Sequence, residues 1–109
     1  MSPVRIPAME QMAGHAVAAA GLLKSLAHPA RLLVMCRLVE GESSVSELQS
    51  LGDLSMSALS QHLSVLREAG LVQTRREAQS IFYTLADSPA LGVMNALHAA
   101  YCAPKRRKK

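Results

Sequence analysis

Residues 54–85, LSMSALSQHLSVLREAGLVQTRREAQSIFYTL, constrain the fold of this chain more than any other segment. Ser55 is a favourable helix N-cap, and three leucines then repeat at the spacing of one helical face. Gly70 ends that helix, and two β-rich runs follow around a polar turn. This order predicts a helix-turn-helix motif whose reading helix is followed by a β-hairpin wing. The leucines are Leu59, Leu63 and Leu66, and the two runs are residues 71–75 and 80–85.

The side of this helix opposite the leucines carries short hydroxyl and amide side chains, where a solvated face usually carries long charged ones. Such side chains fit the major groove of duplex DNA, where they hydrogen-bond base edges and phosphates. An ordinary exposed helix face is the alternative, and the hairpin that follows argues against it. Double-stranded DNA is therefore the expected ligand. The residues of this face are Ser57, Ser60, Gln61, Ser64 and Arg67 or Glu68.

The rest of the chain predicts helices on both sides of this motif. An amphipathic pattern covers residues 8–26, and an almost wholly apolar helix, expected to be buried, runs from Pro29 to about Glu40. A capping-box pattern opens a short third helix, and a last helix follows Ser88-Pro89. The expected fold is mainly α with a β-hairpin, a winged helix-turn-helix in the order α-α-α-α-β-β-α. Residues 1–7 are expected to form a flexible arm, 8–103 the domain and 104–109 a basic tail.

The two terminal helices are amphipathic, but so small a domain offers them little surface to cover. Pairing them with the same helices of a second copy across a two-fold axis would bury both. It would also place two reading helices on one face, and dimeric readers of this type contact DNA half-sites about 34–36 Å apart or at multiples of that spacing. A homodimer through the terminal helices is therefore expected.

The net charge of +4 comes from the C-terminus. Residues 105–109 are all Lys or Arg, and without them the chain holds seven basic and eight acidic residues. Attraction to DNA must therefore come from a local patch on the domain or from the tail. The tail is expected either to add non-specific phosphate contacts or to act only as a solubilising end.

Nothing in the sequence points to catalysis, a cofactor or a membrane. There is no Cys-x-x-Cys pair, no glycine-rich phosphate loop and no supported Ser/His/Asp set. No apolar run is long enough to cross a bilayer, and the N-terminus lacks a secretory pattern. A cytoplasmic protein that is not an enzyme and holds no cofactor is expected. The other classes left open are a thiol oxidoreductase and a module that binds another regulator instead of DNA.

The two cysteines, Cys36 in the second helix and Cys102 at the end of the last, permit two interpretations. In one, Cys36 is a small buried apolar residue and Cys102 a stray thiol, since cytoplasmic chains do not normally hold structural disulfides. In the other, they form a reactive pair. The basic run after Cys102 favours its thiolate, which is the attacking form, whereas the carbonyl end of the helix opposes it.

The segment LAHPARLLVMCRLVEGESSVSELQ, taken with residues 54–85, resembles the arsenic-repressor (ArsR) family of bacterial winged-helix transcription regulators. The similarity covers about residues 15–102. It implies a homodimer that occupies a pseudo-palindromic operator until an inducer releases it. It also implies DNA contacts from Ser57, Ser60, Gln61 and His62 on the reading helix and from Arg75, Arg76 and Gln79 in the wing.

Metal-sensing members of that family carry a Cys-x-Cys pair around the third helix or Asp/His ligands on the last helix. This chain has SSVSEL at residues 43–48 and, on the last helix, only His98 as a plausible ligand. No metal site is therefore expected. A metal-responsive repressor that uses Cys36, Cys102 and His98 or His15 is the alternative.

The placement of the two cysteines instead resembles the thiol- and persulfide-responsive subgroup, which includes biofilm-growth-associated and sulfide-responsive repressors and a haemolysin regulator. This resemblance implies that Cys36 and Cys102 react with reactive sulfur species or oxidants and become bridged by a disulfide or polysulfide. Some members of the subgroup act by displacing another repressor, so an anti-repressor is the second possibility for the output.

Overall fold

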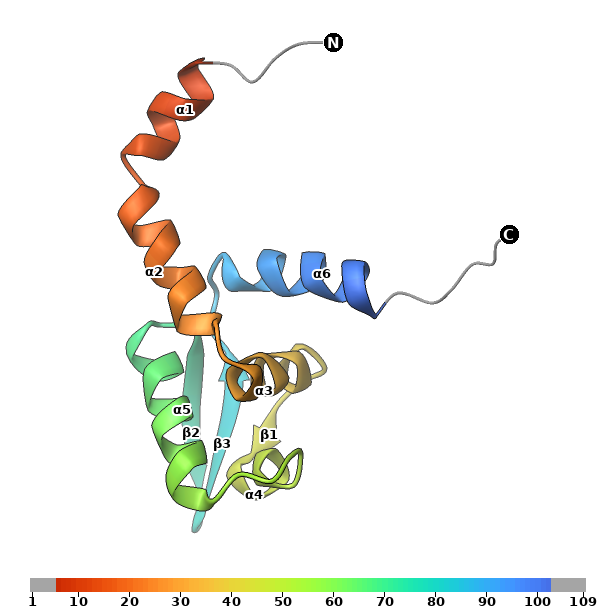
Figure 1. Ribbon diagram of the computed structural model, residues 1–109. Coiled ribbons are helices and arrows are strands. Elements are labelled where there is room, and N and C mark those ends of the chain that lie inside the picture. The colour runs from red at the N-terminus through yellow and green to blue at the C-terminus, as the bar shows by residue number, and fades with distance from the viewer. Residues whose placement is uncertain (1–5, 103–109) are drawn as a thin grey trace, which may run out of the picture.

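The computed structural model describes residues 6–102. Figure 1 shows a body of helices and a hairpin, from which α1 and α2 rise in one direction and α6 extends in another. The elements are α1 (Ile6–Ala13), α2 (Ala16–Leu26), α3 (Pro29–Val39), β1 (Ser43–Ser44), α4 (Val45–Gln49), α5 (Met56–Glu68), β2 (Val72–Glu77), β3 (Ser80–Leu85) and α6 (Ala90–Tyr101).

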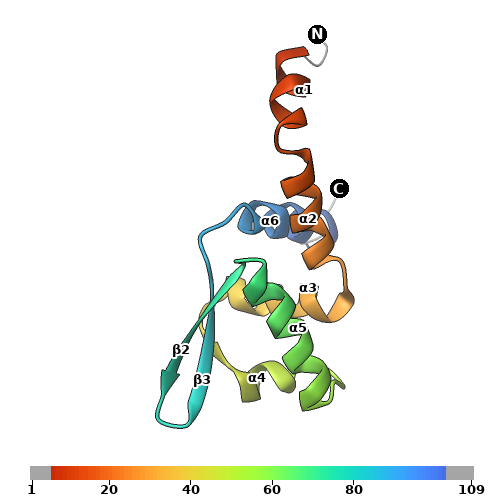
Figure 2. The same cartoon turned by 90° about the vertical axis from the view of Figure 1, so that its left-hand side faces the viewer.

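Helices α3, α4 and α5 pack against a small antiparallel sheet with the strand order β1-β3-β2. The reading helix α5 lies beside the β2–β3 hairpin, which projects from the body as a wing (Figures 1 and 2). Leu59, Leu63 and Leu66 are buried in one core cluster with Met35 of α3. The predicted arrangement of helix-turn-helix and hairpin is therefore confirmed.

The predicted start and stop signals of the central helices are also present. The hydroxyl of Ser55 accepts the backbone N–H of the third residue of α5 at 3.0 Å. Ser44 and Glu47 form a complete capping box at the start of α4. Gly41 and Gly70, with φ of +135° and +76°, follow α3 and α5 in backbone conformations that favour glycine.

The N-terminal helix differs from the prediction of one helix over residues 8–26. It is broken into α1 and α2 at Gly14-His15. Glycine is a poor helix former, and the N–H of His15 bonds to the carbonyl of Met12 at 2.8 Å in a tightened turn that closes α1. Helix α1 begins at Ile6, within the predicted arm; residues 1–5 of that arm and the predicted tail of residues 104–109 lie outside the described residues.

The sheet contains more than the predicted hairpin. The short strand β1, which pairs with β3 through Ser43 and Tyr83, was not expected, because two residues are too short to carry an alternating pattern. The second strand of the hairpin has the predicted bounds, whereas the first runs two residues further, to Glu77, so that only Ala78 and Gln79 form the turn. Ala78 has a φ of +56°, as two-residue hairpin turns require at this position.

Helix α3 is only partly the buried helix that its composition predicts. Val34, Met35 and Leu38 are buried, whereas Leu33 and Val39 on the opposite face are 53% and 42% exposed. That second apolar face is turned toward α6 instead of the core. Within residues 6–102 no single helix is long and apolar enough to cross a membrane; α2 and α3 reach that length and composition only as a pair bent by 93°.

Candidate DNA-binding surface and cysteine pocket

The outer face of α5 is polar and exposed. Burial of the three leucines on its inner side turns this face toward solvent. The face carries hydroxyl, amide and guanidinium groups over about three helical turns. A helix face of this chemistry fits the major groove of DNA. The exposed residues predicted for the site are Ser57, Ser60, Gln61, Ser64 and Arg67.

His62 is the exception on α5, because its ring is half-buried and contacts other side chains. An Nη of Arg31 lies 3.1 Å from Nδ1 of His62, and the ring of His28 lies 4.2 Å from that of His62 between centroids. Arginine can only donate, so Nδ1 is the acceptor and the imidazole is neutral. Burial, and after it the proximity of His28 and Arg31, lowers the pKa of His62.

Arg31 ties the reading helix to the corner between α2 and α3. Its Nε donates to the carbonyl of Ser25 in α2 at 2.7 Å, while its Nη group reaches His62 in α5. His28, at the same corner, caps α3 by accepting the N–H of Ala30 at 3.0 Å. The position of α5 is thus set by polar contacts as well as by its leucines.

In the wing, Arg75 is held by protein contacts. Its Nε and one Nη donate to the two carboxylate oxygens of Glu42 at 2.6 and 2.8 Å, and the other Nη donates to Glu77 at 2.9 Å. The guanidinium also stacks over Phe82, 4.6 Å from the ring centroid. The hydrogen bond from Arg75 lowers the pKa of Glu42, and the bonds to Glu42 and then Glu77 raise the pKa of Arg75.

The other two predicted wing residues are exposed. Arg76 lies near the end of β2 and Gln79 in the turn, at the tip of the hairpin. Arg76 forms no ion pair within residues 6–102. The wing therefore presents one arginine held by carboxylates and one that is open to solvent.

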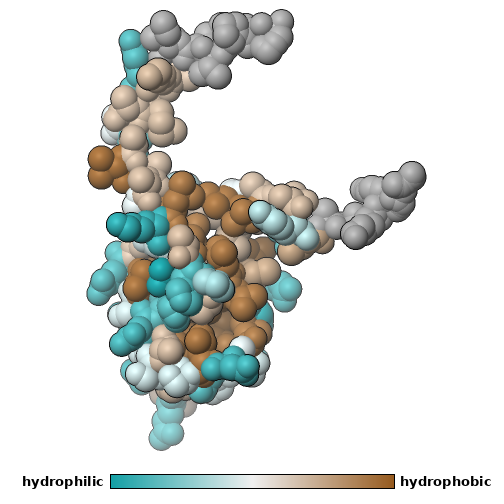
Figure 3. All heavy atoms as spheres, in the orientation of Figure 1, coloured by the Kyte–Doolittle hydropathy of each residue, from teal (hydrophilic) through white to brown (hydrophobic). Residues whose placement is uncertain are grey.

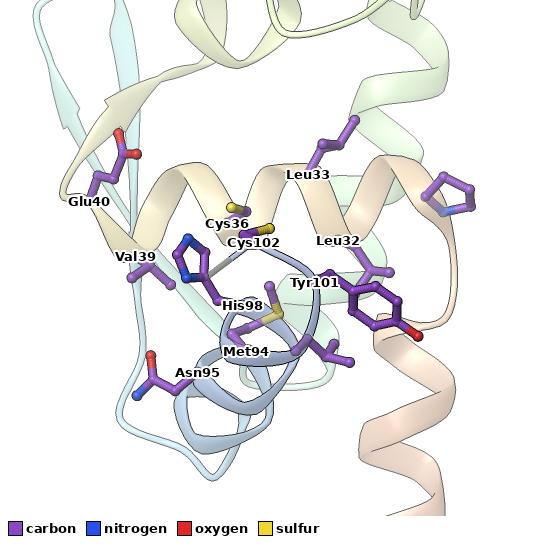
Figure 4. Close-up of a pocket in the computed structure, with 12 residues that line it drawn as sticks. Leu32, Leu33, Cys36, Val39, Glu40, Met94, Asn95, His98, Tyr101 and Cys102 are labelled. Atoms are coloured by element: carbon purple, nitrogen blue, oxygen red, sulfur yellow. The ribbon is translucent and has the colours of Figure 1, made fainter. Parts of the chain in front are cut away.

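The two cysteines line one apolar pocket between α3 and α6. Cys36, in α3, is half-buried, and Cys102, the C-cap of α6, is exposed; both are free thiols. Figure 4 shows the two side chains on facing helices within the pocket, which has a volume of about 510 Å³. The structure thus places two residues that are 66 positions apart in the sequence on one pocket.

Most of the pocket lining is apolar, with a few polar groups on its walls. Glu40, Asn95 and His98 are the polar side chains beside the two thiols. In the part of the chain that the structure describes, no group of three or more His, Cys, Asp or Glu side chains is arranged to hold a metal ion. The apolar lining consists of Pro29, Leu32, Leu33, Val39, Met94, Leu97 and Tyr101.

The terminal helices expose large apolar side chains. Val17 of α2 is 89% exposed, Met9 of α1 is 71% exposed and Tyr101 of α6 is 83% exposed. Figure 3 shows apolar residues over α1, α2 and the junction with α6, while the α5 side is largely hydrophilic. Apolar residues concentrated in this way on projecting helices are typical of a protein interface.

The sequence did not identify Glu42, Arg31 or His28 as parts of the site. Glu42 lies 33 residues from Arg75, and Arg31 lies 31 residues from His62, so no local pattern connects them. Only the pairing of β1 with β3 and the packing of α3 on α5 bring these side chains together.

A polar reading helix that packs on α2 and α3, followed by a β-hairpin, defines a winged helix-turn-helix transcription regulator. Residues 28–74 match the protein family described as "Bacterial regulatory protein, arsR family". The chain belongs to this ArsR family of bacterial transcription regulators, whose members bind DNA, and it is not an enzyme.

Characterised relatives cover nearly the whole chain. The biofilm growth-associated repressor of Agrobacterium fabrum is 52% identical over 94% of this chain and 85% of its own length. The transcriptional activator HlyU of Vibrio cholerae is 46% identical, over 93% and 91% of the two chains. The crystal structure of the transcriptional repressor BigR from Xylella fastidiosa superposes with a TM-score of 0.81 and 47% identity, over 88% of this chain and 98% of that one.

Proposed function

We propose that this regulator is a cytoplasmic, homodimeric repressor whose binding to a pseudo-palindromic operator is switched by bridging of Cys36 and Cys102. Reactive sulfur species or oxidants are the inducers. One observation carries the switching part of the proposal: both thiols line the pocket between the core helix α3 and the C-terminal helix α6.

The operator is read by α5 and contacted by the wing. Gln61 and the serines of α5 lie in the major groove, where an amide can pair with the edge of adenine. Arg67, Arg76 and Gln79 contact phosphates on either side, and the two arginines supply the local positive charge that a near-neutral body needs. His62, which contacts Arg31 and His28, supports the reading helix from behind.

The dimer forms through α1, α2 and α6. Their exposed apolar side chains would be buried against the same helices of a second copy, because a two-fold interface uses the same patch on both subunits. Two reading helices related in this way meet half-sites about 34–36 Å apart, or at a multiple of that distance.

Either class of inducer can form a bridge between the two cysteines without a further reactant. With a peroxide, the two thiols lose two protons and two electrons to form a disulfide, and the peroxide is reduced to water or to water and an alcohol. With an organic hydropersulfide, each thiolate takes up one sulfane sulfur and releases an organic thiol. The two cysteine persulfides then condense to a trisulfide and release hydrogen sulfide.

A bridge would tie α6, part of the proposed dimer interface, to α3, which packs on both α5 and β3. We expect it to change the spacing of the two reading helices. Moving a two-state equilibrium from 99:1 to 1:99 needs about 5.5 kcal/mol. For a two-electron couple, ~30 mV is ~1.4 kcal/mol, so a potential difference of about 120 mV is sufficient if it is fully coupled.

An anti-repressor is the second candidate for the output. The names of the relatives leave this role open, because HlyU is called a transcriptional activator. The relative from Agrobacterium fabrum is called a repressor. In that role the protein would still bind DNA through α5 and the wing, and would displace another protein from its site.

Selection of bound duplexes from a random pool by the reduced protein tests the DNA-binding part of this proposal. We expect enrichment of a two-fold symmetric motif, with half-sites one or two helical turns apart. If no motif is enriched, the protein is not a sequence-specific reader.

A further inference from the structure

The contact between Glu42 and Arg75 joins the wing to the loop that follows α3. It is bidentate, with both carboxylate oxygens of Glu42 accepting from separate guanidinium nitrogens. The third nitrogen donates to Glu77, and the plane of the group covers Phe82. Every nitrogen of the Arg75 guanidinium therefore has a carboxylate partner.

The same loop is also held from the side of α3. Arg37, the residue after Cys36, donates through its two Nη groups to the carbonyls of Gly41 and Glu42 at 3.2 and 3.4 Å. One residue further on, β1 begins and pairs with β3. Glu42 thus lies where the end of α3, the sheet and the wing meet.

We propose that Glu42 and Arg75 are positioning residues of the DNA-binding surface. Their ion pair fixes the wing against the loop after α3, and Arg75 acts on DNA through the placement of the wing instead of contacting a phosphate. The proposal rests on the DNA-binding function proposed above.

The outer strand β2 needs such a support because little of it is buried. In β2 only Val72 is buried, and the rest of the strand is exposed. A two-stranded hairpin is marginally stable by itself. A bidentate pair with a stacked aromatic ring is geometrically more specific than an ordinary surface ion pair. Three of the five N–H donors of Arg75 are already used within the protein, and its charge is offset by two carboxylates.

Arg76 provides the matched control within the same strand. It is the next residue, points to the opposite face of the hairpin and has no ion pair among residues 6–102. Arg76 therefore represents an arginine that is available to phosphate. The variants to compare are Glu42→Gln, Arg75→Gln, Arg75→Lys and Arg76→Gln.

The test measures the affinity of each full-length variant for a duplex selected by the wild-type protein, over a range of salt concentrations. Arg76→Gln should weaken binding and reduce the slope of log affinity against log salt by about 1. The three variants at positions 42 and 75 should weaken binding about threefold to fivefold. Their slope of log affinity against log salt should equal that of the wild-type protein. Lysine should not rescue position 75, because it lacks the planar fork.

Hydrogen exchange and thermal unfolding complete the test without DNA. Amides of β2 and β3 should exchange faster in the Glu42 and Arg75 variants but not in Arg76→Gln, while the temperature of global unfolding stays unchanged. Tighter binding by Glu42→Gln, a reduced slope in Arg75→Gln, or wild-type behaviour of Arg75→Lys would each overturn the proposal. So would unchanged exchange in the wing. Failure of the wild-type protein to select any duplex is a separate result, and overturns the DNA-binding function itself.

Discussion

Cys36 on α3 and Cys102 at the end of α6 face the same apolar pocket, one half-buried and the other exposed. We therefore expect an organic hydropersulfide or a mild oxidant to link them within one chain. Cys102 should react first, because its sulfur is more accessible. Peptide mapping by mass spectrometry under non-reducing conditions should show the disulfide, or with persulfide a bridge heavier by one sulfur atom.

Single variants provide the control for this bridge. Cys36→Ser should still gain a persulfide at Cys102, whereas Cys102→Ser should react slowly at Cys36. Bridges found only between two chains, or unchanged masses under all treatments, would argue against an intramolecular switch.

Gln61 should contribute sequence-specific affinity. Replacing it by alanine removes an amide that can pair with a base edge, and a good bidentate contact of that type contributes about 1–3 kcal/mol of discrimination. Fluorescence anisotropy with the selected duplex should show a loss of about tenfold or more, while binding to a scrambled duplex is unchanged. Equal losses on both duplexes would show that Gln61 does not read sequence.

Val17 should lie in the dimer interface. A charge at this almost fully exposed position of α2 would have to be buried without a partner in the dimer, so Val17→Glu should shift the protein toward monomer. Light scattering after size-exclusion chromatography gives the mass directly. Leu51→Glu, at an exposed apolar position after α4, is the control and should remain dimeric. A wild-type monomer would contradict the proposed assembly.

His62 should make stability depend on pH. The ordinary pKa of a histidine is 6.5, and burial, with His28 and Arg31 nearby, lowers the value in the folded protein. Between the two values the unfolded chain binds more protons, so stability rises with pH there. The contribution of neutral His62 to the free energy of unfolding is complete above about pH 6.5. It is lost as the pH falls through the lowered pKa of the folded protein.

Thermal unfolding at a series of pH values tests this dependence. The wild-type unfolding temperature should fall more steeply below pH 6.5 than that of His62→Gln. His15→Gln, at an exposed histidine outside this cluster, should keep the wild-type profile. Parallel profiles for wild type and His62→Gln would exclude His62 as the titrating group.

The central helices and the hairpin could be predicted because their signals are local. The leucine spacing of α5, its Ser55 cap and the Ser44–Glu47 capping box depend on residues within a few positions of one another. The break at Gly14 was missed because the apolar pattern continues across it on both sides. The exposed second face of α3 was missed for a different reason: an all-apolar helix does not reveal which face meets the core.

The functional surface was predictable in composition but not in geometry. The exposed serines and Gln61 follow from the period of α5. The contact of Arg31 with His62 and that of Glu42 with Arg75 do not, because each joins residues on separate elements. From the sequence alone, Arg75 is therefore interpreted as a cation available to DNA. Its contact with Glu42 is seen only in the folded chain.

The central claim is that bridging of Cys36 and Cys102 controls binding to DNA. Its most direct test is the affinity of the full-length dimer for the selected duplex in the reduced, disulfide-bridged and polysulfide-bridged states. We predict that either bridge weakens binding by at least about tenfold, or ~1.4 kcal/mol, that a reductant restores it, and that Cys36→Ser and Cys102→Ser do not respond. Equal affinities of the wild-type protein in all three states would contradict the account.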